Sequence, residues 1–144
     1  MGIKEYIVFI SGIILSILSS LFGYYDTALK TLVLFVVIDY ITGTLSAVYN
    51  GHNLSSKRGL QGLIKKFLYF CIVAISFQID KLLGLDGILR YMSIYSLIAN
   101  DGLSIIENAS EIGIPIPKRL VKCLEVIKEK GETEWLIEIK FIII

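Results

Sequence analysis

The sequence has few of the residues on which metal sites and enzyme active sites depend. Its 144 residues include one histidine and two cysteines, and neither Cys71 nor Cys123 has the spacing of metal ligands. We interpret both cysteines as incidental and His52 as a loop residue. No nucleophile is paired with a base, and no phosphate-binding loop is present. The sequence therefore predicts no catalytic residues, no metal site, no cofactor and no enzyme activity.

A large excess of charge of one sign is also missing. The formal net charge is +1, so the overall charge does not favour binding to nucleic acid. Charged residues make up 19% of the chain against 55% hydrophobic residues, and the mean hydropathy is +0.73. This composition lies outside the usual range for a soluble domain of this size, and it predicts a membrane protein.

Long apolar segments are what the sequence does contain. Residues 6–25 carry no charged side chain, and about 20 apolar residues are needed for a helix to cross the ~30 Å hydrocarbon core of a bilayer. A cleaved signal peptide is the less favoured alternative, because the apolar run is too long for one. With the further segments 31–49, 64–85 and 87–111, the sequence predicts an all-α membrane protein, a small bundle of three to four transmembrane helices.

Asp39 lies near the middle of the second apolar segment. About ten aliphatic or Phe residues at roughly −0.3 to −0.6 kcal/mol each barely outweigh one central Asp at about +3 kcal/mol. We therefore expect Asp39 to face a helix interface or a water-filled cavity rather than lipid. Two interpretations remain open, a neutral carboxyl that joins helices by hydrogen bonds and a carboxyl on a water pathway.

The fourth segment, 87–111, carries a stripe of polar side chains. At about 100° per residue, one sector of the helix holds Arg90, Ser93, Ser96, Asn100, Asp101, Ser104, Glu107, Asn108 and Glu111. These side chains about cancel the insertion energy of the Ile and Leu residues, so we expect this helix to insert only when paired with another helix, such as the Asp39 face. The candidate pore-lining or interhelical polar residues are Asp39, Arg90, Asn100, Asp101, Ser104, Glu107 and Asn108.

Small residues mark possible helix contacts. The candidate helix-packing residues are Gly12, Ser16, Gly23 and Gly43. Three of them, together with Ser19 and Ser20, share one face of the first segment at three-to-four spacing, which lets another helix approach closely in lipid. The alternative is that small residues are simply common in membrane helices, and the two interpretations have equal weight.

Basic residues cluster in two places. The segment 52–66 contains no acidic residue and is predicted to be a cytoplasmic loop under the positive-inside rule. The segment 118–130 is amphipathic and follows a Gly-Ile-Pro-Ile-Pro sequence that ends the preceding helix. A merely solvated basic tail is the alternative for this second cluster. The candidate lipid-headgroup contacts are Lys57, Arg58, Lys65, Lys66, Lys118, Arg119 and Lys122.

These charges favour four crossings with both termini in the cytoplasm. Three crossings, with one apolar segment lying in the membrane interface, is the main alternative. The predicted domains are a transmembrane helical domain, 1–112, and a cytoplasmic basic tail with an amphipathic helix, 113–144. Within that tail, residues 132–144 alternate and then become wholly apolar, a pattern typical of an aggregation-prone strand, and we assign them no function.

Several motifs occur in a fixed order between about residues 34 and 130. They are Asp39-Tyr-Ile-Thr-Gly43, the basic segment from Ser55 to Lys66, Asn100-Asp-Gly-Leu-Ser-Ile-Ile-Glu-Asn108, and Gly113-Ile-Pro-Ile-Pro-Lys118. In these motifs the chain resembles the toxin-secretion and phage-lysis holin family. Asp101 stands where Glu is more often expected, a change that keeps the charge. The apolar end of the chain departs from the polar tail typical of the family.

The resemblance implies a protein of the bacterial cytoplasmic membrane that contacts lipids and forms homo-oligomers. The oligomers would open lesions or pores through which a phage endolysin leaves to lyse the host cell or, in some members, a toxin is secreted. The resemblance assigns no atomic role to the motif residues. Two other classes of function remain as alternatives: a small ion-conducting, proton-conducting or transporter subunit that uses Asp39, and a membrane anchor or scaffold.

Overall fold

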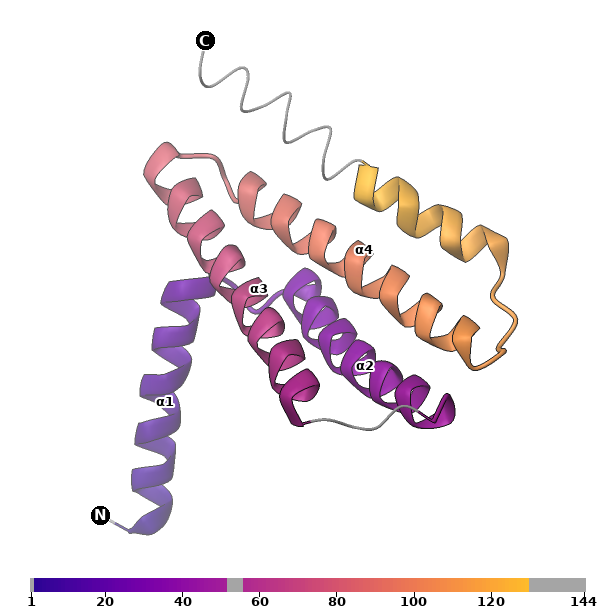
Figure 1. The fold of residues 1–144 in the computed structure, drawn as a ribbon. Coiled ribbons are helices and arrows are strands. Elements are labelled where there is room, and N and C mark those ends of the chain that lie inside the picture. Colours follow the sequence, from indigo (N-terminus) through magenta and orange to yellow (C-terminus); the bar gives the residue numbers. More distant parts are fainter. Residues whose placement is uncertain (1, 52–55, 130–144) are drawn as a thin grey trace.

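The structure, a computed structural model, describes residues 2–51 and 56–129 and consists of helices (Figure 1). The labelled helices are α1 (Ile3–Phe22), α2 (Thr27–Tyr49), α3 (Ser56–Leu83) and α4 (Ile88–Glu111), and a further helix covers 118–129. No strand occurs in the described ranges. The prediction of an all-α membrane protein is confirmed, whereas His52 and the strand-like segment 132–144 lie outside the described residues.

Three of the helices are long and apolar enough to cross a membrane. They are α1, α2 and the Gly59–Leu83 part of α3, as judged by length and composition. Helix α4 is long enough, but its polar stripe keeps it out of this group. This agrees with the insertion energies, which predict that α4 enters a membrane only beside a partner helix.

Helix α3 begins eight residues before the predicted apolar segment. The basic residues up to Lys66 therefore lie on the first turns of α3, where the sequence predicted a loop. Lys, Arg, Leu and Gln are good helix formers, and their propensity outweighs the two glycines among them. The predicted loop is thus wrong for residues 56–66, which are helical.

Helix α4 forms the centre of the bundle, packed along α2 and α3 (Figure 1). The buried cluster between these helices consists of Leu29, Leu32, Val73, Ile94 and Ile98. Helix α1 stands apart from the other helices and has no buried residue (Figure 1). Its contact with α3 is made by the C-terminal end of α1. Its large apolar side chains are exposed along its whole length, as suits a helix surrounded by lipid.

Helices α2 and α4 run parallel, with their matching ends side by side. Arg90 in the first turn of α4 pairs with Asp26, the residue that caps the start of α2. At the other end, the hydroxyl of Ser46 donates a hydrogen bond to the carboxylate of Glu111. Since the two helices are also similar in length, α4 covers α2 from end to end.

The start of α4 is fixed by a carboxylate from α3. The two Asp80 oxygens accept hydrogen bonds from the backbone N–H groups of Leu89 and Arg90 at 2.9 and 2.8 Å. These N–H groups have no partner within the helix, and negative charge is stabilising at a helix N-terminus. The buried Asp80 side chain thereby links the end of α3 to the start of α4.

The helix 118–129 turns back along α4, as Figure 1 shows. Its buried Leu124 lies against Gly102, near the middle of α4. A Cβ atom at Gly102 would stand 2.9 Å from Cδ2 of Leu124 and 3.1 Å from Cε1 of Phe35, so any larger residue there would force these side chains to move. The division at residue 112 into membrane domain and cytoplasmic tail stays a prediction.

Candidate functional site

A buried ion-pair cluster joins α2, α3 and α4. The ammonium Nζ of Lys66 lies 2.8 Å from Oδ2 of Asp39 and also contacts Oδ1 of Asp101. The Asp101 side chain is 1% exposed, and the side chains of Lys66 and Asp39 are 13% and 14% exposed. We call these three residues the triad. Because charges are costly to bury unless they are paired, the triad accounts for the position of Asp39 inside an apolar segment.

One oxygen of each triad carboxylate has no hydrogen-bond partner. Oδ1 of Asp39 and Oδ2 of Asp101 are both buried and unsatisfied. Lys66 is therefore shared between two carboxylates and satisfies one oxygen of each. Each carboxylate therefore keeps one buried oxygen that lacks a hydrogen-bond donor, which is uncommon in folded proteins.

Further polar contacts continue from the triad along the helices. The ring of Tyr69 lies below the Lys66 ammonium, 4.8 Å from Nζ to the ring centroid, and its hydroxyl accepts a hydrogen bond from Asn100 at 2.7 Å. Two turns further along α4, Nδ2 of Asn108 donates to Oγ1 of Thr42 at 3.2 Å. Three residues of the α4 stripe, Asn100, Asp101 and Asn108, therefore contact polar groups of α2 and α3.

A second ionic cluster closes the other end of the bundle. The buried Arg90 guanidinium donates to the backbone oxygens of Phe22 and Tyr24 at 2.7 and 2.8 Å, and its Nη1 lies 2.7 Å from the Asp26 carboxylate. The hydroxyl of Tyr91 donates to the same carboxylate at 2.9 Å. Arg90 thus ties the connection between α1 and α2 to the start of α4. Because all three nitrogens of the Arg90 guanidinium donate hydrogen bonds, we assign this arginine a role in joining the helices.

These contacts set the acidity of Asp26. Burial by itself raises the pKa of this carboxyl, but the hydrogen bonds from Arg90, the Leu29 backbone and Tyr91 outweigh it and lower the pKa from 3.8 to about 2. Asp26 lies between α1 and α2, outside the candidate spans. It is therefore ionised throughout the physiological pH range.

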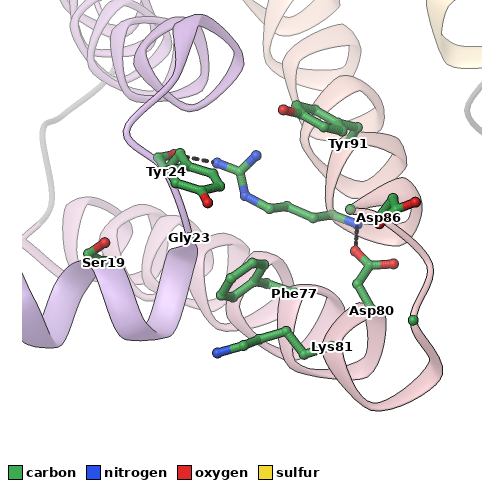
Figure 2. Close-up of a pocket in the computed structure, with 11 residues that line it drawn as sticks. Ser19, Gly23, Tyr24, Phe77, Asp80, Lys81, Asp86 and Tyr91 are labelled. Carbon is green, nitrogen blue, oxygen red and sulfur yellow. Dashed lines mark hydrogen bonds between the residues drawn. The ribbon is translucent and has the colours of Figure 1, made fainter.

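A cavity of about 560 Å³ adjoins the Arg90 cluster, between the ends of α1 and α3 and the start of α4 (Figure 2). The ring of Phe77 and the side chain of Lys81 line it from α3, and Gly23 lines it from the end of α1. Gly23 has a positive φ of 76°, and a Cβ there would stand 2.8 Å from the Phe77 ring. Glycine is required at this position, which the sequence predicted as a helix contact.

Of the other residues that the sequence analysis singled out, some contact a neighbouring helix and others are exposed. Gly43 lies beside Asn108, Ser104 is half-buried, and Glu107 is exposed on α4. On α1, a Cβ at Gly12 would meet no atom within 4 Å, and Ser16 is exposed. Five of the candidate headgroup contacts are exposed: Lys57, Lys65, Lys118, Arg119 and Lys122. Arg58 lies in the first turn of α3.

Lys66 differs from its predicted role as a headgroup contact. Its ammonium points between the helices because two carboxylates there offer stronger partners than a solvated surface. The prediction grouped it with its exposed neighbour Lys65, since both occur in the same basic run. The useful signal was helical spacing, which places Lys66 and Tyr69 on one face of α3 and Lys65 on another.

The sequence analysis did not assign interhelical roles to Asp26, Asp80 or Tyr69. An Asp that precedes a helix is a preferred N-cap residue, and this is the signal that could have identified Asp26. Asp26 fulfils that role by accepting from the Leu29 N–H at 2.9 Å, and Asp80 does so for α4 across a turn. Tyr69 carried no distinguishing signal, because tyrosine is common in membrane helices.

Comparisons with known proteins agree with this architecture. The sequence model of the bacteriophage holin family matches residues 16–129. An uncharacterized protein of Listeria monocytogenes is 40% identical over 120 residues, which cover 83% of this chain and 85% of that protein. A probable holin of Bacillus phage phi105 is 35% identical over 96 residues, covering 67% of this chain and 70% of the phage protein.

A further relative is an uncharacterized 14.9 kDa protein of Clostridium perfringens, which is 35% identical over 112 residues. These residues cover 76% of this chain and 83% of the relative. No solved structure matches the chain. The family match extends from the second half of α1 to the end of the helix 118–129 and includes both ionic clusters. The chain therefore belongs to the bacteriophage holin family.

Proposed function

We propose that this protein oligomerises in the bacterial cytoplasmic membrane and opens lesions that release an endolysin, leading to lysis of the host cell. The observation that carries the proposal is that part of the polar stripe of α4, including buried Asp101 and half-buried Asn108, lies against α2 and α3 within the single chain. A polar surface hidden in a membrane protein becomes a water-facing wall once its partner helices separate. The relationship to a probable phage holin supports the same function.

The proposed mechanism exchanges contacts within a chain for contacts between chains. In the single chain, α4 hides its stripe against the Asp39 face of α2. Helix α1 exposes Gly12 and Ser16 and has no buried residue, so it is available to pack against a second copy. When local concentration is high, several copies would turn their α4 stripes toward a shared water-filled opening.

The proposed topology has four crossings, with both termini in the cytoplasm. Its support is the parallel packing of α4 on α2, which places both ends of α4 at the same depth as the ends of a candidate span. The basic first turns of α3 favour the cytoplasm for the connection between α2 and α3. The α1–α2 connection, with Asp26 and the Arg90 cluster, then faces the opposite side.

Release of trapped cargo from liposomes tests the function. The purified protein is titrated against liposomes that hold a small dye and a fluorescent folded protein. We expect release of both, with a steep dependence on the protein-to-lipid ratio. Saturable flux of small ions alone would favour the function of a transporter subunit. No release at any protein-to-lipid ratio would contradict lesion formation and favour an anchor or scaffold.

A reversible covalent lock tests the mechanism. Thr42 and Asn108 are in side-chain contact, so Thr42→Cys with Asn108→Cys can join α2 to α4 in a background with Cys71→Ser and Cys123→Ser. We expect no release while the disulfide is formed and full release after reduction. The matched control is Ser76→Cys with Ser93→Cys, which joins α3 to α4 and leaves the α2–α4 contact free. Release from the oxidised Thr42–Asn108 pair would rule out the separation of α2 and α4.

A further inference from the structure

The charges of the triad do not balance. Lys66 supplies one positive charge, whereas ionised Asp39 and Asp101 supply two negative charges. The uncompensated charge would lie beside Asp101, whose side chain is 1% exposed. An unpaired charge at such a site costs several kcal/mol, and proteins avoid that cost by neutralising the group.

The unsatisfied atoms show where neutralisation is needed. Oδ1 of Asp39 and Oδ2 of Asp101 are buried and have no partner. Because both carboxylates contact the same ammonium nitrogen, they lie within about two hydrogen-bond lengths of each other. An ionised carboxylate only accepts hydrogen bonds, so neither carboxylate can donate to the other unless one of them carries a proton.

No other group on the surrounding helices supplies the missing charge. Among the side chains that the structure describes, which leave out Arg58, Lys66 is the one cation in ion-pair contact with either carboxylate. Tyr69 from α3 and Asn100 from α4 are neutral and add no charge: Asn100 donates to the Tyr69 hydroxyl, and that hydroxyl also interacts with Asp101. The helix 118–129 contributes Leu124 beside Gly102, while its charged Lys118, Arg119, Lys122 and Glu125 are exposed.

We propose that the Asp39–Lys66–Asp101 triad is a binding site for a single proton, held between the two carboxylates. The bound proton makes the triad neutral and gives the free oxygens one donor and one acceptor. A proton fits better than a metal ion, since Na⁺, Mg²⁺ or Ca²⁺ would need more oxygen ligands than two free carboxylate oxygens. In this proposal, α2, α3 and α4 are joined by one ammonium, two carboxyl groups and one bound proton, with no net charge.

Proton loss has a consequence for lesion opening, and this part rests on the proposed function. Without the proton, α2 and α4 would face each other with two negative carboxylates and one shared ammonium. The unbalanced negative charge is stabilised by water, so deprotonation favours the separated helices over the packed ones. The triad would then set the pH dependence of opening.

Infrared spectroscopy of the full chain in lipid tests the proton site directly. A protonated carboxyl has a C=O stretching band distinct from that of a carboxylate, and exchange into D₂O shifts it. We expect the band in the wild type at neutral pH, and its loss in both Asp39→Asn and Asp101→Asn, where a single carboxylate pairs with Lys66. The matched control, Glu107→Gln on the exposed side of α4, should retain the band.

Further results of the same measurement would overturn or support the proposal. Absence of the band in the wild type overturns it, as does a band that survives in both Asn variants. Lys66→Gln should increase the band area about twofold, because both carboxyls then need a proton. A site that requires Na⁺ or K⁺, with no protonated carboxyl, also overturns it. Because liposome release is measured separately, a band without release refutes the lesion function alone, and release without a band refutes the proton site alone.

Discussion

The Lys66 ammonium lies 2.8 Å from the Asp39 carboxylate, and this ion pair joins α3 to α2 inside an apolar bundle. The same nitrogen contacts Asp101 of α4, so one side chain holds three helices. The partner of Asp39 is thus a cation on a neighbouring helix. The sequence analysis predicted that Asp39 faces a helix interface or a water-filled cavity, and it did not identify this cation.

Loss of Lys66 is expected to destabilise the bundle strongly. Lys66→Met leaves two buried carboxylates without a cation, and breaking a buried ion pair in this way costs about 3–5 kcal/mol. The measurement is chemical unfolding in detergent, followed by helical circular dichroism. Lys65→Met is the matched control, because Lys65 is the exposed neighbour on α3. Equal stability of the two variants would show that the triad does not hold the helices together.

Arg90→Met is expected to loosen the junction between α1 and α2. The variant removes the donors to the Phe22 and Tyr24 carbonyls and the ion pair with Asp26, at a cost of about 3 kcal/mol. Hydrogen exchange at residues 22–26 should become faster. Lys81→Met serves as the control, because exposed Lys81 lines the same cavity without an ion pair to α2. Unchanged exchange in the Arg90 variant would contradict the role of this cluster.

Asp26 should make stability depend on pH in the acid range. Its pKa falls from 3.8 to about 2 on folding, so its contribution is fully present above 3.8 and is lost as the pH falls through about 2. The size of this contribution is about 2 kcal/mol, from the shift in pKa. Unfolding measured over this range in the wild type and in Asp26→Asn tests it. The variant should lack this part of the pH dependence, and identical profiles would refute the assignment.

A larger residue at position 102 should displace the helix 118–129. Gly102→Val places atoms where Leu124 and Phe35 now lie, and overpacking of this kind costs about 1–3 kcal/mol. Limited proteolysis at Arg119 and Lys122 should become faster. Gly62→Val is the control, because a Cβ at Gly62 meets no atom within 4 Å. If both variants are cleaved at the wild-type rate, the contact between Leu124 and Gly102 does not hold this helix in place.

The sequence by itself determined the class of the protein and the character of its helices. Hydropathy and helical periodicity depend on neighbouring residues, so the membrane helices, the buried position of Asp39 and the polar stripe of α4 were predictable. The stripe also had to face a partner helix, because its polar groups about cancel its insertion energy. The boundaries were less well defined, and the basic start of α3 was interpreted as a loop.

Only the tertiary structure decided which polar groups meet. Lys66 and Asp101 are 35 residues apart, and Arg90 and Asp26 are 64 residues apart. Their pairing depends on the rotation and register of whole helices. A hydrophobic pattern shows which face of a helix is buried, but it does not show which residue of another helix lies opposite. A basic run likewise contains both exposed Lys65 and mostly buried Lys66, and the packing of α3 between two carboxylates determines which lysine turns inward.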